Sequence, residues 1–168
     1  MANVKLGKAE SMIRGWIQHY NHEKYWKIRA IVIDPSSKYS KILRLLFLFY
    51  LKRCDAFNNA STGIHLGYGA KFKSVPTMVH GLYGVMISHN AVIGESCTIY
   101  HQVTIGDTMK GAPVIGDNVY IGAGAKIIGP VHVGDNARIG ANCVVVHDVP
   151  ANSTVVAQEG IIIKRNYG

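Results

Sequence analysis

Eight histidines are spread along the chain, and their positions indicate which of them could act on a substrate. His80 stands apart because it lies in segment 79–84, beside two glycines and inside a break in an otherwise regular repeat. A neutral imidazole held at a cleft can take a proton from a hydroxyl near neutral pH. We therefore expect His80 to be a general base. Four further histidines occupy positions typical of surface or turn residues, namely His89, His101, His132 and His147.

The repeat around His80 places a large aliphatic residue at every sixth position from residue 87 to 145, with one break. Four residues after nine of these ten comes a smaller apolar residue, and a glycine often follows the large one directly. A period of six fits neither an amphipathic helix nor one alternating strand, but it suits a short strand plus a turn wound into a solenoid. The aliphatic residues expected to point inward are Ile87, Ile93, Ile99, Ile105, Ile115, Ile121, Ile127, Val133, Ile139 and Val145.

Glycine and the breaks in the repeat give further expectations. Where glycine follows the aliphatic residue, it is expected to supply a backbone conformation that other residues would strain. Leu66, Phe72 and Met78 keep the period of six, so the first coil should begin there. Segments 79–84 and 107–113 interrupt the period and should bulge out as loops. Such loops on a rigid scaffold are where function is often placed.

Three cysteines are present, and Cys97 and Cys143 fall at inward positions of the repeat. We expect both to be core residues, neither nucleophiles nor metal ligands. An odd number of cysteines without paired spacing argues against a disulfide framework and is typical of a reducing compartment. The first residues lack the apolar stretch of a signal peptide. These features together predict a cytoplasmic protein.

Residues 1–60 are predicted to be helical and carry most of the positive charge of a chain whose net charge is +8. One helix is expected within 10–33, ending at Asp34 and Pro35, and a second should open near Ser36 or Ser37. The apolar run 42–51 is far shorter than the ~20 residues of a membrane-spanning helix. Two interpretations remain open: this helix packs on the solenoid or a neighbouring subunit, or residues 38–53 contact an anionic membrane at its inner face.

Two motifs carry a resemblance to a known family. Ile-Gly-Ala-Gly-Ala-Lys-Ile at 121–127 and Ile-Gly-Ala-Asn at 139–142 resemble the hexapeptide-repeat acyltransferases, in the branch of serine acetyltransferases and O-acetyltransferases of bacterial surface polysaccharides. The resemblance covers about residues 61–157, between the helical segment 1–60 and a tail 158–168. It implies a mainly β fold, a left-handed parallel β-helix, assembled as a homotrimer or a dimer of trimers.

The resemblance also implies acetyl-CoA as cosubstrate, lying in a groove between adjacent solenoids, and no metal. His80 matches the general base that deprotonates the acceptor hydroxyl for direct attack on the thioester. Gly106, Ala123 and Ala141 match positions along the pantetheine groove, and Lys126 is a candidate for the cofactor's phosphates. Lys164 and Arg165 in the tail are weaker candidates for the same phosphates.

This sequence departs from the serine acetyltransferases at several points. The loop 107–113 lacks the Arg-His pair that holds the amino-acid acceptor in that family, and Ala-Gln-Glu-Gly at 157–160 replaces its usual Gly-Val-Pro-Ala turn. The aspartate that orients the catalytic histidine falls near Gly63, so its carboxylate is missing, although Asp55 could in principle reach. These departures favour a sugar hydroxyl of a surface polysaccharide or its precursor over free serine as acceptor.

Three alternatives stay open beside the polysaccharide O-acetyltransferase. The first is a serine O-acetyltransferase. The second is a metal-binding trimer like the γ-class carbonic anhydrases, with His80, His89 and His101 as ligands. The third is a non-catalytic scaffold, which the missing carboxylate motivates. Nucleic-acid binding has no motif behind it beyond net charge.

Overall fold

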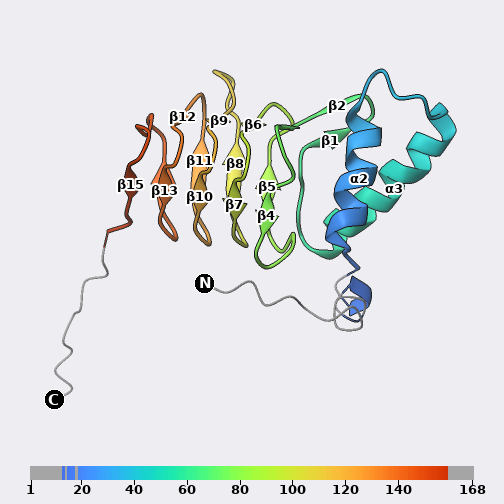
Figure 1. The fold of residues 1–168 in the computed structure, drawn as a ribbon, viewed down its shortest axis with the longest axis horizontal. Coiled ribbons are helices and arrows are strands. Elements are labelled where there is room, and N and C mark those ends of the chain that lie inside the picture. Colours follow the sequence, from blue (N-terminus) through green and yellow to red (C-terminus); the bar gives the residue numbers. More distant parts are fainter. Residues whose placement is uncertain (1–12, 14, 18, 159–168) are drawn as a thin grey trace, which may run out of the picture.

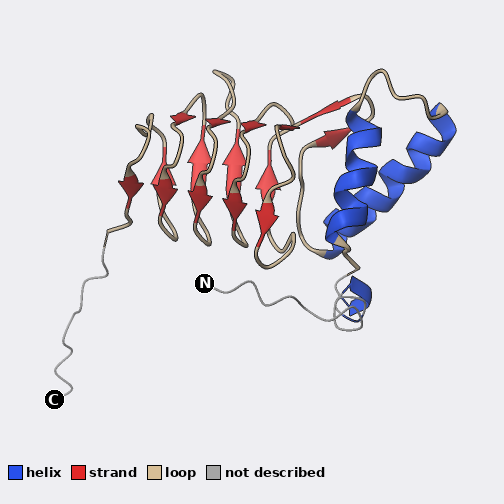
Figure 2. Ribbon diagram, viewed as in Figure 1, coloured by secondary structure: helices blue, strands red, loops and turns tan. Residues whose placement is uncertain are grey.

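A computed structural model describes residue 13, residues 15–17 and residues 19–158. Two helices at one end of the molecule are followed by a solenoid of short strands, stacked along its long axis (Figures 1 and 2). Helix α2 (His22–Ile33) begins after Asn21, whose side chain accepts a hydrogen bond from the Lys24 amide at 2.9 Å. Helix α3 (Lys41–Phe57) begins after Ser40, whose hydroxyl caps the Leu43 amide. The predicted opening near Ser36 is therefore wrong, because Ser36 bonds Asp34 in the preceding turn.

The solenoid consists of three parallel sheets, named here by their first strands. The β4 sheet holds β4 (Thr77–Met78), β7 (Thr98–Ile99), β10 (Tyr120–Ile121), β13 (Arg138–Ile139) and β15 (Thr154–Val155). The β5 sheet holds β5 (Met86–Ile87), β8 (Thr104–Gly106), β11 (Lys126–Ile128) and β14 (Val144–Val145). The β3 sheet holds β3 (Lys71–Phe72), β6 (Val92–Ile93), β9 (Val114–Ile115) and β12 (His132–Val133). The predicted mainly β parallel solenoid with an N-terminal helical segment is confirmed; the left-handed winding stays a prediction.

Strand pairing confirms both predicted interruptions. Tyr120 pairs with Arg138, 18 residues later, which is one regular coil of three hexapeptides. Thr77 pairs with Thr98, 21 residues later, because the segment 79–84 adds residues to that coil. Thr98 pairs with Tyr120, 22 residues later, because the loop 107–113 lies between them. Both insertions are absorbed at corners, so the strands above and below stay in register.

The start of the coil differs from the prediction in one respect. Leu66 lies in the turn of an antiparallel hairpin formed by β1 (Ile64–His65) and β2 (Tyr68–Gly69). Phe72 and Met78 do belong to parallel strands. The period of six therefore begins with Phe72, and the hairpin joins the helices to the first coil.

The core of the solenoid is the predicted one. Every large aliphatic residue of the repeat from Ile87 to Val145 is at most 4% exposed. The smaller apolar residues four positions later are buried beside them, including Cys97 and Cys143. Their thiols donate to backbone carbonyls, Cys97 to Gly116 at 3.3 Å and Cys143 to Val155 at 3.4 Å. Burying about ten such side chains is the main stabilising contribution, at roughly 1.5–3 kcal/mol each.

The corners turn by a different device from the one predicted. The glycines after the aliphatic residues do not have positive φ; the left-handed residues lie two positions further on and are mostly not glycine. Asparagine tolerates this conformation better than most residues. Its side chains also stack, Asn118 donating to Asn136 at 3.0 Å and Asn136 to Asn152 at 3.1 Å. The positive-φ corner residues are Ser96, Gln102, Asn118, Gly124, Asn136, Asn142 and Asn152.

At several corners where glycine follows the aliphatic residue, the next coil comes too close for a side chain. A Cβ placed at Gly94 would lie 2.2 Å from the carbonyl oxygen of Gly116, a backbone atom that cannot move alone. At Gly106 the nearest atom would be the terminal Cδ1 of Ile128, at 3.0 Å. The prediction that these glycines supply a special backbone conformation is therefore wrong, because what they avoid is contact between coils.

These two glycines provide a matched test of that cause. Gly94→Ala is expected to lower the free energy of unfolding by about 1–3 kcal/mol, because the two coils must separate. Gly106→Ala should cost less, since only the end of a flexible side chain must move. Urea unfolding followed by circular dichroism measures both changes. Equal losses in the two variants would contradict the contact explanation.

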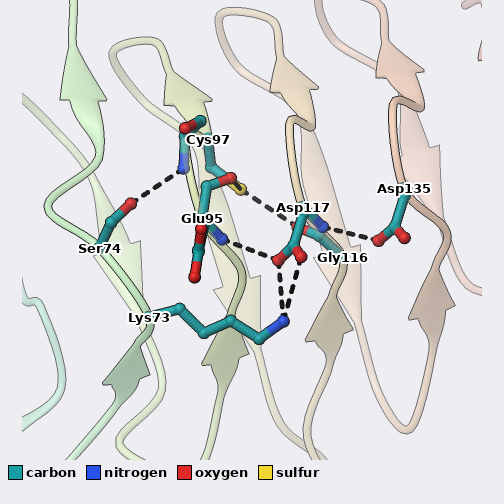
Figure 3. A network of polar contacts seen from close by, with 8 residues as sticks. Lys73, Ser74, Glu95, Cys97, Gly116, Asp117 and Asp135 are labelled. Carbon is teal, nitrogen blue, oxygen red and sulfur yellow. Dashed lines mark hydrogen bonds and ion pairs between the residues drawn. The ribbon is translucent and has the colours of Figure 1, made fainter.

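Acidic side chains tie neighbouring coils together on one edge (Figure 3). Asp117 accepts the backbone N–H of Glu95 at 2.9 Å, and the amide of Asp117 donates to Asp135 at 2.8 Å. Lys73 adds an ion pair to Asp117 at 3.0 Å. The hydrogen bond from the Glu95 amide and then that from the Lys73 amine hold the pKa of Asp117 below its usual range. The pair is exposed to solvent, which screens it, so it contributes little to stability alone.

The helices are joined to the first coil through a buried polar cluster, defined here as Tyr25, Arg29, Asp55 and Thr62. The Tyr25 hydroxyl donates to Asp55 at 2.5 Å and lies 2.7 Å from the Thr62 hydroxyl. Arg29 donates to the carbonyls of Thr62 at 3.1 Å and Ala70 at 2.6 Å. Burial lowers the pKa of Arg29 to about 10 and raises those of Tyr25 and Asp55. The guanidinium thus stays charged at neutral pH and satisfies carbonyls that water cannot reach.

Candidate active site

A pocket of about 450 Å³ opens where the first interruption meets the helical segment. Its lining combines apolar and aromatic side chains with a few polar ones, the usual character of a small-molecule site. His80 and His101 contribute the two imidazoles. The residues around it are Ile17, Phe57, Asn58, His80, Tyr83 and His101.

The insertion 79–84 gives His80 its position. Leu82 is fully buried and anchors the loop, while Gly81 and Gly84 take φ of 69° and 65° to turn the chain around it. The Gly84 amide donates to the carbonyl of Asn58, and the Tyr83 carbonyl accepts from the Gln102 amide, both at 2.9 Å. The loop is therefore held from both sides, by the end of α3 and by the next coil. His80 itself stays exposed at its edge.

His80 is framed by aromatic rings. His101 lies edge-on with its ring centroid 4.9 Å from that of His80, and Tyr100 is 5.8 Å away. The Nδ1 atom of His101 is buried without a hydrogen-bond partner in the described part of the chain. His101 lies in a turn, as predicted, and the structure also places its ring beside the candidate base. Its position 21 residues after His80, one enlarged coil further on, is the signal that could have found it.

No carboxylate lines the pocket among the residues that the structure describes. Asp55, the one acid considered able to reach His80, is buried in the polar cluster and accepts the Tyr25 hydroxyl. Thr62, beside the position of the missing aspartate, belongs to the same cluster. The group next to His80 is thus an imidazole, not an acid.

Three of the four predicted cofactor residues share one corner with His80. The turns between the β4 and β5 sheets stack on one another, with the Gly124 amide donating to the His101 carbonyl and the Asn142 amide to the Ala123 carbonyl. Ala123 and Ala141 lie in these turns, and Ala141 is exposed. The Lys126 amine, at the start of β11, donates to the carbonyls of Gln102 at 2.9 Å and Gly124 at 3.0 Å. An ammonium has three donors, so one N–H remains for a ligand.

Gly106 lies elsewhere. It ends β8, opposite Ile128, at the corner that leads to the β3 sheet and to the loop 107–113. Within one subunit the structure does not bring Gly106 to the corner of His80. Lys164 and Arg165, the remaining phosphate candidates, lie outside the described residues.

The three histidines considered as metal ligands, His80, His89 and His101, do not all come together. The His89 ring packs against His65 at 5.2 Å and Tyr68 at 5.8 Å, at the corner between β5 and β6, away from His80 and His101. Among the described residues, no three His, Cys, Asp or Glu side chains are grouped to hold a metal. The cysteines are free and buried, and burial raises the pKa of the Cys97 thiol. Neither a zinc-type site nor a reactive thiolate is evident in this part of the chain.

Comparison with known proteins agrees with this architecture. Residues 112–147 match the family described as bacterial transferase hexapeptide (six repeats). A serine acetyltransferase of Staphylococcus aureus is 39% identical over 151 residues, covering 88% of this chain and 60% of its own length. This chain belongs to the hexapeptide-repeat transferase family. It spans about three fifths of the length of the curated relative it matches.

Solved structures show the same fold. A Brucella abortus serine acetyltransferase in complex with coenzyme A is 31% identical, with a TM-score of 0.63, covering 84% of this chain and 53% of the other. A Neisseria gonorrhoeae serine acetyltransferase in complex with serine is 30% identical, with a TM-score of 0.56, covering 89% and 54%. Both of these structures that share the fold are serine acetyltransferases.

Proposed function

We propose that this hexapeptide-repeat protein is an acetyl-CoA-dependent O-acetyltransferase with L-serine as its first candidate acceptor. The carrying observation is His80, an exposed imidazole at the edge of a 450 Å³ pocket, beside stacked turns with small residues. The similarity to serine acetyltransferases, including structures named as complexes with coenzyme A and with serine, supports this choice over the polysaccharide acceptor favoured by the sequence.

In this proposal His80 accepts the proton of the acceptor hydroxyl as its oxygen attacks the thioester carbonyl. The new C–O bond forms, the C–S bond breaks, and the proton passes from the imidazole to the departing thiolate of CoA. Such a base contributes about 10²–10⁴-fold. No covalent acetyl-enzyme is needed, which agrees with the burial of all three cysteines.

The residues of the stacked corner suit a CoA chain. Ala123 and Ala141 have side chains too small to cover their turn backbones, so amide groups can approach a pantetheine arm. Lys126 keeps one N–H for a phosphate. Gly106 would contribute only if a second subunit brought its corner to this groove. We propose a homotrimer for this reason, and outward-facing Met86 and Val144 on the β5 sheet, 45% and 67% exposed, suit burial between subunits.

A sugar hydroxyl is the second candidate acceptor, and the loop 107–113 favours it. The loop closes through paired hydrogen bonds between Thr108 and Gly111, at 2.9 and 3.0 Å, and lacks the Arg-His pair of the serine enzymes. Its tip, Met109, is fully exposed. Without these side chains, the carboxylate of serine loses an expected partner.

Release of CoA from acetyl-CoA distinguishes the two acceptors. Wild-type protein is assayed with L-serine, with nucleotide sugars and with oligosaccharides, and turnover with serine is expected. Turnover with a glycan alone would make the second candidate correct. If acetyl-CoA does not bind in a calorimetric titration, the proposed activity is wrong for both acceptors.

A further inference from the structure

Helix α3 carries an apolar stripe that nothing in the described chain covers. Ile42, Leu45, Leu46 and Phe49 recur at the spacing that puts side chains on one face of a helix. They are 75%, 47%, 62% and 70% exposed. The opposite face packs inward through Leu51, Cys54 and Asp55. Figure 1 shows that the start of α3 is the part of the helix farthest from the coils.

Cations flank this stripe at both ends. Lys38 and Lys41 lie at its beginning and Lys52 and Arg53 at its end, and all four are exposed. From Pro35 to Cys54 the sequence contains no acidic residue. The fifth cation of the segment, Arg44, is turned inward and donates to the carbonyls of Val32 and Asp34, both at 2.7 Å. The exposed face therefore presents four apolar side chains between two pairs of positive charges.

The charge pattern argues against a second copy as the partner. Because both ends of the stripe are basic, α3 helices paired antiparallel would place Lys38 and Lys41 near Lys52 and Arg53 of the other copy. A parallel pair would place identical cations side by side. Like charges across an interface oppose association, whereas an anionic surface neutralises all four at once.

From this pattern we propose that α3 lies flat on an anionic phospholipid membrane. The stripe Ile42, Leu45, Leu46 and Phe49 enters the acyl boundary, and the flanking cations meet the headgroups. No described helix is long and apolar enough to cross a membrane. The contact is therefore interfacial, and it does not depend on the proposed acetyl transfer.

Sedimentation with lipid vesicles tests the proposal. The full chain should sediment with vesicles of phosphatidylcholine plus phosphatidylglycerol and not with phosphatidylcholine alone, and added salt should weaken binding. The double variant L46Q and F49Q, which replaces two of the four apolar residues of the stripe, should reduce vesicle binding on the order of a hundredfold. The double variant K38Q and K41Q should bind about 25-fold more weakly, at roughly fivefold for each charge removed.

Met109→Gln is the control, because Met109 is an apolar side chain even more exposed than Leu46 and Phe49 and lies on a loop outside α3. It should bind vesicles as the wild type does. All variants replace exposed residues, and circular dichroism verifies that they fold. Absence of sedimentation with anionic vesicles would overturn the proposal. So would a molar mass, measured by light scattering, that falls in L46Q with F49Q while vesicle binding is unchanged, because the stripe would then join subunits. Acetyl transfer is measured separately, so its failure would leave this result standing.

Discussion

His80→Ala is expected to lower kcat for acetyl transfer by about 10²–10⁴-fold, the usual contribution of a general base. Binding of acetyl-CoA should change little, because the predicted cofactor residues Ala123, Lys126 and Ala141 lie on other coils. Steady-state CoA release gives kcat, and calorimetric titration gives the affinity. The expected result is therefore a loss in the chemical step with binding retained.

The control for His80 is His132→Ala. His132 is also an exposed histidine, but it lies in β12 on a different sheet. It should retain wild-type kcat. His101→Ala should give a smaller loss than His80→Ala, because its ring positions the His80 imidazole and does not take the proton. Full activity in His80→Ala would remove His80 from the mechanism, and equal losses in all three variants would indicate a general structural effect.

The largest expected loss of stability follows Arg29→Met. The methionine removes the guanidinium that lies over the rings of Trp26 and Phe72. Two buried carbonyls, of Thr62 and Ala70, also lose their donor. Each buried group left without a partner costs about 1–3 kcal/mol. We expect the free energy of unfolding to fall by about 3 kcal/mol in total. Urea unfolding monitored by tryptophan fluorescence measures the change.

Arg138→Met provides the comparison for this prediction. Arg138 also lies over an aromatic ring, that of Tyr120 at 4.9 Å, but its side chain is exposed. Its replacement should change stability by less than about 1 kcal/mol. A similar small change in Arg29→Met would mean that water reaches the two carbonyls and that the cluster does not hold the helices to the coil.

The sequence was sufficient to predict the solenoid because the inward residues obey one period. Each coil buries the same kind of side chain, so Ile121 and Ile139 report the same environment and the pattern is visible without a structure. The hairpin at Leu66 was missed because its spacing imitates the repeat while its backbone runs antiparallel. The role of glycine was misjudged because contact between coils, as at Gly94 and Gly116, involves residues 22 positions apart.

The site was only partly predictable. The break in the repeat indicated His80, since loops that interrupt a regular scaffold are where function is often placed. The proximity of His101 to His80 was not predicted, because the length of that loop determines which residues of consecutive coils meet. Asp55 could not be assigned from sequence, because its partner Tyr25 lies 30 residues earlier and on another helix.

The placement of both insertions at corners bears on how such proteins diverge. Residues were added at 79–84 and at 107–113 without shifting any strand above or below them. A corner loop can therefore lengthen, shorten or change its side chains while the stacked interior keeps its buried aliphatic residues. A lineage could exchange one acceptor for another by altering a few surface residues, with no need to evolve a new scaffold.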